Sequence, residues 1–278
     1  MSTAVFLGGG RITTALLAGL RGAGYRTPIV VHDRNPGKLR DLKRKFGVRE
    51  EANLEVALAH ARNGLLIFAV RPDSTLALAE EIAGIVSRST DSSSRSQPPS
   101  FTACSLAAGI PLAQLRTALP PPVRWARAMP SPACRSGRGL TAVTYDRGIS
   151  KSARMRVKGL FARVGPVLEI PESQFDAFTV TYSCTHGYHA LDILARAAQR
   201  TGLDRETALT AAAHALADGI LGWREGDLPL EELLEEAATP GGIAATVMQT
   251  MNTQGHPRLV ERGLRAGIAR MRKTSRRR

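Results

Sequence analysis

A run of glycines close to the amino terminus could hold the phosphates of a nucleotide. It lies between an apolar run at 4–7 and an amphipathic stretch, in the segment Gly8-Gly9-Gly10-Arg11-Ile12-Thr13. In a turn from strand to helix, Gly8 would permit the tight bend, and Gly10 would let the backbone approach a pyrophosphate at the free N–H groups of the helix. Thr13 stands where a third glycine is usual, and it would weaken close packing of the helix on the strand. The pattern favours dinucleotide binding over a plain glycine-rich turn.

Charged residues follow the second apolar run, at 29–31, where nucleotide-binding enzymes recognise the adenosine ribose. An acidic residue such as Asp33 binds the ribose hydroxyls of NAD, and an arginine such as Arg34 accommodates the 2′-phosphate of NADP. Lys38 supports the second interpretation, and the planar guanidinium of Arg34 could instead stack on the adenine. The sequence therefore predicts NADP or NAD as the cofactor without deciding between them.

The elements that must position these residues are short apolar runs alternating with amphipathic stretches. The runs lie at 4–7, 29–31, 65–70, 101–104, 123–126 and 140–143, and the helical stretches at 11–23, 36–46, 53–61, 72–87, 111–118 and 150–162. This alternation predicts an α/β Rossmann domain with a doubly wound, mainly parallel sheet. The polar, Ser-rich segment 87–100 is predicted to be a flexible surface loop.

The pattern changes after residues 165–171, where strand signals stop and Ala- and Leu-rich helical patterns begin. Helices are indicated at 190–200, 207–223, 243–254 and 257–272. We therefore place a Rossmann domain at 1–170 and an all-α dimerisation and substrate domain at 171–278. So few helices around so much apolar sequence indicate packing against another subunit.

Composition narrows the class of protein. Hydrophobic residues make up 43% of the chain, which argues against disorder. No apolar run is long enough to span a membrane, and the first ten residues do not resemble a signal peptide. Three widely spaced cysteines, Cys104, Cys134 and Cys184, indicate neither a disulfide framework nor a metal site, so we expect a cytoplasmic protein. The net charge of +14 is partly concentrated at 270–278, and with 5% aromatic residues we do not expect specific nucleic-acid binding.

Six segments, in order and over nearly the whole chain, resemble the pyrroline-5-carboxylate reductase family. They are Ala52–Glu55, Phe68–Pro72, Ser105–Ile110, Arg127–Ala133, Glu172–Ala177 and Thr239–Gly242. The resemblance implies a Rossmann domain, a helical domain that interlocks two subunits, and NAD(P)H-dependent reduction of a cyclic imine. Asn53 then corresponds to a contact with the adenosine ribose. The remaining positions assigned to the cofactor are Val70, Arg71, Pro72, Ala107, Ala108 and Gly109, and those assigned to the substrate are Met129, Pro130, Pro240, Gly241 and Gly242. The resemblance also implies that substrate lies between the nicotinamide and the helical domain of the dimer.

Departures from the family pattern concentrate in the expected substrate region. The family has a threonine that bonds the imine nitrogen, and the corresponding position here is Ala244. The segment 182–188 also differs, and it introduces His186 beside Tyr188. Either side chain could donate a proton in place of the lost threonine, or both could be ordinary helix residues. Thr239 could bind substrate through its hydroxyl, and Thr-Pro is also typical of an N-cap followed by a first helical residue.

Three functions remain open on these residues. The first is reduction of pyrroline-5-carboxylate to proline. The second is a paralogous reductase of the same fold, acting on another imine or carbonyl compound in specialised metabolism. The third is a non-catalytic dinucleotide-binding regulator, against which the retained cofactor segments argue.

Overall fold

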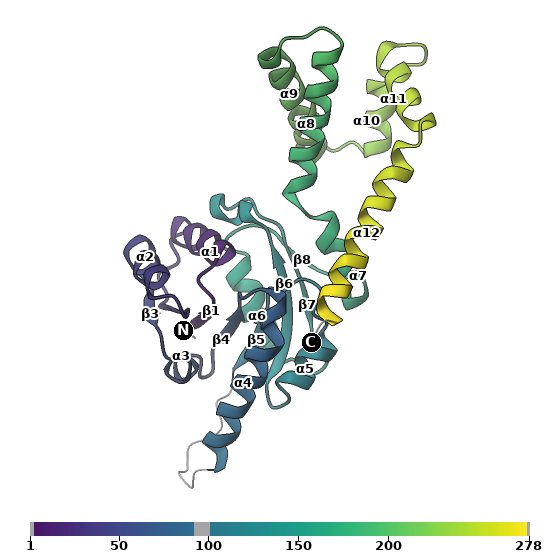
Figure 1. Ribbon diagram of the computed structural model, residues 1–278. Coiled ribbons are helices and arrows are strands. Elements are labelled where there is room, and N and C mark those ends of the chain that lie inside the picture. The colour runs from purple at the N-terminus through teal and green to yellow at the C-terminus, as the bar shows by residue number, and fades with distance from the viewer. Residues whose placement is uncertain (1–2, 92–100, 277–278) are drawn as a thin grey trace. The chain divides into compact units, whose positions relative to one another are not determined.

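The computed structural model describes residues 3–91 and 101–276 of the 278-residue chain. It divides into two compact units. The first comprises Met1–Val180 together with Ile268–Arg278, and the second comprises Thr181–Gly267 (Figure 1). The predicted domain boundary at residue 170 lies inside the first unit and stays a prediction.

An eight-stranded sheet forms the centre of the first unit. Its strands are β1 (Ala4–Leu7), β2 (Ile29–His32), β3 (Arg49–Glu51), β4 (Leu65–Phe68), β5 (Thr102–Ser105), β6 (Arg124–Pro130), β7 (Thr141–Tyr145) and β8 (Val167–Glu169). They lie in the order β3-β2-β1-β4-β5-β6-β7-β8, and every neighbouring pair is parallel except β6 and β7. The predicted mainly parallel sheet is therefore confirmed. The order reverses between β1 and β4, which is where ligands bind in doubly wound sheets.

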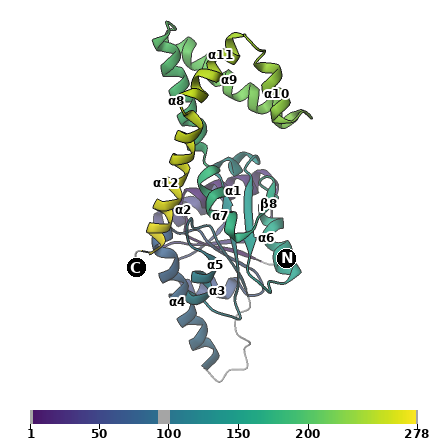
Figure 2. The ribbon, with the colours of Figure 1, turned by 90° about the vertical axis from the view of Figure 1, so that its right-hand side faces the viewer.

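Helices cover both faces of this sheet, which explains why its central strands are apolar without alternation. The helices of the first unit are α1 (Arg11–Gly22), α2 (Pro36–Phe46), α3 (Leu54–His60), α4 (Pro72–Asp91), α5 (Leu112–Ala118), α6 (Lys151–Phe161) and α7 (Glu172–Thr181), with a 3-10 helix η1 (Pro132–Ser136). One buried cluster joins Phe6 and its neighbours to α1, α2 and α6. A second cluster joins Val5 and Leu7 to α3, α4 and α5. These three helices lie on the other face of the sheet (Figure 2).

The polar segment 87–100 begins inside α4 and not in a loop. Because α4 continues to Asp91, the loop prediction is wrong for residues 87–91. Ser87 fits the helix because its hydroxyl donates a hydrogen bond to the carbonyl of Ala83, one turn earlier, at 3.0 Å. The rest of that prediction, at 92–100, lies outside the described residues.

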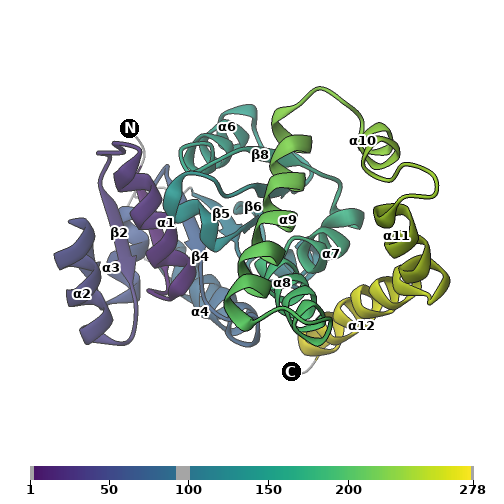
Figure 3. The same ribbon diagram turned by 90° about the horizontal axis from the view of Figure 1, so that it is seen from above.

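The second unit is wholly helical. It contains α8 (Cys184–Arg200), α9 (Arg205–Glu225), α10 (Leu230–Ala237), α11 (Ile243–Thr253) and most of α12 (His256–Arg276), the end of which belongs to the first unit. Helices α8 and α9 pack side by side (Figure 3). The buried hydrophobic residues between 181 and 267 are three alanines, Ala195, Ala208 and Ala212. This unit therefore has very little core of its own.

Candidate functional site

The turn between β1 and α1 requires a glycine at position 8. Gly8 has a φ of +107°, and a Cβ there would lie 2.7 Å from the carbonyl oxygen of Ala69. Its N–H donates to the carbonyl of His32 at 2.7 Å. The turn is thus held against the chain that leaves β2 and β4, in the arrangement that the motif predicts.

The backbone at the start of α1 has free space in front of it, at Gly10. Gly10 is the N-cap, in an extended conformation, and a Cβ built on it would meet no atom within 4 Å. The N–H groups of the first helical turn have no carbonyl partner inside the helix, so they are available to an anion. Arg11 and Ile12 belong to this turn, at the carboxyl edge of the sheet.

Thr13 is accommodated by a hydrogen bond. Its side chain is fully buried, and its hydroxyl donates to the carbonyl of Gly8 at 2.6 Å. The closest packing of α1 occurs further along the helix, at Gly19, where a Cβ would overlap the carbonyl of Cys134 in η1. A third glycine in the turn is therefore not needed for the helix to pack.

Asp33 lies directly after β2 and faces the glycine turn. Its Oδ2 accepts a hydrogen bond from the N–H of Gly9 at 2.7 Å, and its Oδ1 accepts one from Asn35 at 2.8 Å. Lys38 lies 3.8 Å from the same carboxylate. Arg34 projects away, with its side chain 88% exposed and 3.7 Å from Glu81. Both candidates for ribose recognition are thus present. The carboxylate of Asp33 is held in place by the N–H of Gly9, whereas the side chain of Arg34 is exposed.

Two further cofactor candidates begin helices at the same edge. Asn53 is the N-cap of α3, where its Oδ1 accepts a hydrogen bond from Val56 at 3.1 Å. Pro72 is the first residue of α4, after Val70 and the exposed Arg71. The side chain of Val70 would lie 3.2 Å from a Cβ on Gly8, so the loop after β4 touches the glycine turn. Because the strands are parallel, these loops share one edge of the sheet.

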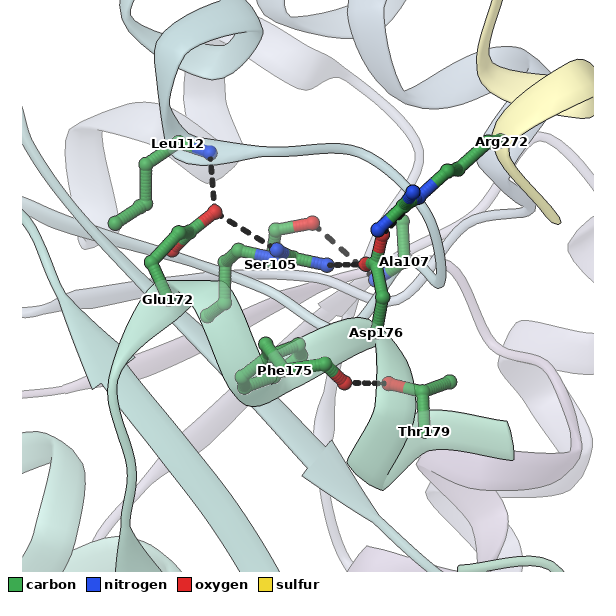
Figure 4. Close-up of polar contacts among 9 residues, drawn as sticks. Ser105, Ala107, Leu112, Glu172, Phe175, Asp176, Thr179 and Arg272 are labelled. Atoms are coloured by element: carbon green, nitrogen blue, oxygen red, sulfur yellow. Dashed lines mark hydrogen bonds and ion pairs between the residues drawn. The ribbon is translucent and has the colours of Figure 1, made fainter. Parts of the chain in front are cut away.

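The loop after β5 contains the remaining cofactor candidates. Ser105 ends the strand, and its Oγ accepts a hydrogen bond from the N–H of Ala107 at 3.2 Å (Figure 4). Ala107 is buried and Ala108 half-buried. Gly109 has a φ of +76°, and a Cβ there would lie 2.6 Å from the side chain of Met271 in α12. The end of α12 therefore packs directly on this loop, a contact that the sequence does not reveal.

A buried arginine is connected through Glu172 to the end of the same loop, at Leu112. The side chain of Arg127, in β6, is 1% exposed, and its Nη1 donates to Oε1 of Glu172 at 2.8 Å. The same Oε1 accepts a hydrogen bond from the N–H of Leu112, where α5 begins (Figure 4). The guanidinium lies over the ring of Phe175, 4.1 Å from its centre. Arg127, Glu172 and Phe175 occur in segments that resemble the family, but their mutual contact appears only in the folded chain.

The network extends to α12 through a second carboxylate. Asp176 lies 3.7 Å from Nη2 of Arg127 and accepts a hydrogen bond from Nε of Arg272 at 3.2 Å (Figure 4). Three buried polar atoms of this cluster have no hydrogen-bond partner, namely Nε and Nη2 of Arg127 and Oε2 of Glu172. Removing either carboxylate would therefore leave the buried charge of Arg127 less compensated.

The predicted substrate residues fall into two groups. Met129 and Pro130 end β6, within the sheet of the first unit, where Met129 is half-buried and Pro130 buried. Pro240, Gly241 and Gly242 belong to the second unit. Their roles stay predictions.

Thr239 and Pro240 are not the start of a helix, so the N-cap interpretation is wrong. Gly241 has a φ of +79°, and the N–H of Gly242 donates to the carbonyl of Thr239 at 2.9 Å, which is the pattern of a Pro-Gly β-turn. Gly242 is the N-cap, and α11 starts at Ile243. The N–H of Gly242 is therefore already used by the turn, and a substrate carboxylate would meet the N–H groups that follow it.

The two proton-donor candidates lie near the start of α8. The N–H of His186 donates to the carbonyl of Ser183 at 3.0 Å, and Ser183 caps the helix through the N–H of Thr185. Both His186 and Tyr188 are exposed, Tyr188 to 70%. Their proposed role in proton transfer stays a prediction.

Over residues 3–91 and 101–276, no group of three His, Cys, Asp or Glu side chains could hold a metal ion. Within the same ranges, no helix is both long enough and apolar enough to cross a membrane.

Two family models match separate parts of the chain. Residues 3–91 match the family described as NADP oxidoreductase, coenzyme F420-dependent. Residues 172–274 match the family described as pyrroline-5-carboxylate reductase dimerisation. The predicted cofactor, NADP or NAD, agrees with the first of these descriptions.

Curated relatives match over nearly their full length. The pyrroline-5-carboxylate reductase of Thermus thermophilus is 33% identical over 247 residues, which are 85% of this chain and 85% of that protein. The enzyme of Mycobacterium tuberculosis is 27% identical over an alignment of 290 residues, which covers 97% of this chain and 96% of that protein.

Solved structures share the fold. A pyrroline-5-carboxylate reductase from Coxiella burnetii has a TM-score of 0.83 at 22% identity, covering 99% of both chains. The Plasmodium falciparum pyrroline carboxylate reductase, solved with NADP bound, has a TM-score of 0.80 at 18% identity, covering 99% of this chain and 98% of that one. The predicted Rossmann domain followed by a helical domain is confirmed.

Proposed function

The chain belongs to the pyrroline-5-carboxylate reductase family, and on that premise we propose that it reduces pyrroline-5-carboxylate to proline with NADPH or NADH. Such a family member is an NAD(P)-dependent oxidoreductase. The observation that carries the proposal is the glycine turn at the reversal point of the sheet, with the loops after β2, β4 and β5 beside it.

The residues of this edge fit a dinucleotide. The open backbone at Gly10 and the first turn of α1 would receive the pyrophosphate, and Asp33 would receive a ribose hydroxyl. Arg34 and Lys38 would favour a 2′-phosphate, so we expect both NADPH and NADH to bind. The bound cofactor supplies a hydride, which with one proton converts the C=N bond of the substrate to CH–NH.

The protein's own contribution to the chemistry is orientation and polarity. A substrate iminium already carries its proton, so the chain needs no strong acid at this step. We assign the substrate carboxylate to the start of α11, after Gly241 and Gly242, with Thr239 as a further contact. His186 and Tyr188 are our candidates for protonating or hydrogen-bonding the nitrogen, since Ala244 has no hydroxyl.

We also propose a homodimer or a higher homo-oligomer, in the cytoplasm. The second unit leaves many large apolar side chains exposed, including Ile193, Leu209, Ile220 and Trp223. Exposed apolar area of this extent on a helical unit with so small a core favours burial against another copy. The match to a dimerisation family supports the same conclusion.

A changed substrate is the second candidate function. Ala244 and the altered segment 182–188 remove groups that the family uses near the imine, while the cofactor edge is retained. This combination fits a paralogous reductase for another imine or carbonyl compound. A non-catalytic nucleotide-binding regulator is a weaker candidate, because it gives no reason to retain the whole cofactor edge.

The experiment is to follow the absorbance of NADPH and NADH when pyrroline-5-carboxylate is added to the purified protein. Rapid oxidation of either cofactor supports the lead proposal. Tight cofactor binding without turnover rejects pyrroline-5-carboxylate as the substrate and leads to a screen of other cyclic imines. If neither cofactor binds, the reductase proposal is wrong.

A further inference from the structure

A concave region lies at the other edge of the parallel sheet, where β1 and β4 begin. Its lining includes the first residues of those strands, Ala4 and Leu65, and Leu160 of α6, and its volume is about 510 Å³. Strands β1 and β4 are four residues long, so this edge lies roughly 10 Å from the edge with the glycine turn. The cavity is therefore separate from the candidate nucleotide site, and all of it belongs to the first unit.

Positive charge surrounds this cavity. Three arginines line it, Arg26 before β2, Arg156 in α6 and Arg163 just after α6, and no acidic side chain is among its described lining residues. Arg21 lies close enough to feel the charge of Arg26. Burial lowers the pKa of Arg21, and the charge of Arg26 lowers it further. Without an acidic partner in the lining, the charge is left for a ligand or for solvent.

One of these guanidinium groups has an unused donor. Nη2 of Arg156 donates a long hydrogen bond of 3.4 Å to the hydroxyl of Thr102, but its Nε is buried and has no partner. A buried donor without an acceptor is unfavourable, so an acceptor that entered the cavity beside Arg156 would be bound with a gain.

The remaining lining leaves room for more than a single ion. A Cβ on Gly24 or on Gly159 would meet no atom within 4 Å. Tyr25 and Met155 add apolar surface, and Met155 is 63% exposed. The cavity thus combines cationic groups with open, partly apolar space.

We propose that this cavity binds a small anion bearing a phosphoryl group, held by the guanidinium groups of Arg26, Arg156 and Arg163. A phosphoryl group offers two negative charges and three acceptor oxygens, which match several planar guanidinium donors better than one carboxylate does. The site is distinct from the one proposed for the cofactor, so both ligands bind together.

The test is calorimetric titration of the full-length protein with pyrophosphate, at constant ionic strength and with saturating NADPH. We expect one saturable site per chain. Arg26→Met and Arg163→Met each remove an exposed side chain, so both variants should fold, and each should weaken binding about tenfold.

Two matched variants separate this site from a general basic surface. Lys158→Met removes one positive charge from α6, outside the cavity, and should bind pyrophosphate as the wild type does. Gly159→Leu adds a side chain in open space without changing charge, and it should abolish binding while α6 remains folded.

Three results would overturn the proposal. They are no saturable binding by the wild type, loss of binding when NADPH is added, and an equal loss in Lys158→Met and Arg163→Met. If NADPH itself fails to bind, the titration is repeated with Gly10→Ala, whose altered nucleotide turn must leave pyrophosphate affinity unchanged. Failure of the reductase proposal is thereby kept apart from failure of this one.

Discussion

At the scale of single residues, the glycines of the nucleotide turn serve different purposes. Gly8 is required by the fold, since its φ is +107° and a Cβ would collide with the carbonyl of Ala69. Gly10 is not required by the fold, because the space in front of it is open. The open space at Gly10 is where a pyrophosphate would approach the backbone.

Replacing Gly10 with alanine should therefore impair binding and leave folding intact. We expect the dissociation constant of NADPH, followed by its fluorescence, to rise about tenfold, because the new methyl group occupies the path of the pyrophosphate. The loss of stability should not exceed about 1 kcal/mol, the usual range for an N-cap position. Gly22→Ala, at the other end of α1, also meets open space and is the control. Equal affinity in both variants would show that the pyrophosphate does not lie at Gly10.

Arg127 illustrates a residue whose importance depends on its charge partners. Arg127→Met would leave the carboxylates of Glu172 and Asp176 without their buried cation and would remove the contact with Phe175. We expect a loss of about 3 kcal/mol in the free energy of unfolding, measured with urea. Arg124→Met, an exposed arginine on the same strand, should change it by less than about 0.5 kcal/mol. Similar values for the two variants would contradict a stabilising role for the network.

At the scale of elements, helix ends determine the positions of the polar candidates. Asn53 caps α3, Ser183 caps α8, and Gly242 caps α11, so each of these candidate segments lies at the start of a helix. The end of α12 belongs with the sheet and packs on Gly109, which connects the last helix of the chain to the cofactor loop.

The start of α11 offers a test of the lost threonine. Ala244 is exposed in the first turn, so Ala244→Thr should fold normally. If the chain reduces pyrroline-5-carboxylate, the added hydroxyl should leave kcat/KM unchanged or raise it, because it restores a hydrogen bond to the imine nitrogen. The measurement is kcat/KM from steady-state kinetics of this variant. Ala245→Thr, at the half-buried neighbouring position, is the control. A loss of activity specific to Ala244→Thr would count against the proposed alignment of this loop.

At the scale of the whole molecule, the two units are stabilised in different ways. The first has two buried clusters, one on each face of its sheet. The second buries three alanines and exposes large apolar side chains from α8 to α12. A unit with so small a core is expected to gain its stability from association.

Charged substitutions on α9 should therefore dissociate the protein. Ile220 is 56% exposed, and Ile220→Asp would place a charge in the proposed contact between copies. We expect sedimentation velocity to show a dimer or larger assembly for the wild type and a shift to monomer for this variant. Val56→Asp, on an exposed site of α3, is the control and should keep the wild-type assembly. A monomeric wild type would refute the proposed oligomer.

The local pattern of residues was sufficient to predict most of the sheet, most of its covering helices and the glycine turn. Buried parallel strands need continuous apolar runs and a strand-to-helix turn needs glycine, so both features appear in neighbouring residues. The short edge strands β3 and β8 were not predicted, because each pairs with one neighbour and stays partly exposed, which requires no apolar run. The first residues of the polar segment 87–100 were wrongly predicted as a loop. A serine can stay in a helix when its hydroxyl donates a hydrogen bond to a backbone carbonyl one turn earlier, as Ser87 does.

Only the tertiary structure decided what depends on residues far apart in the chain. Arg127 meets Glu172, Met271 covers Gly109, and Arg26 shares a cavity with Arg156 and Arg163. A Pro-Gly turn after Thr239 likewise stands where the sequence also allowed an N-cap. Local patterns record how each residue suits its own strand, helix or turn, whereas these contacts arise from the way the elements pack, and packing brings together side chains that sequence spacing does not relate.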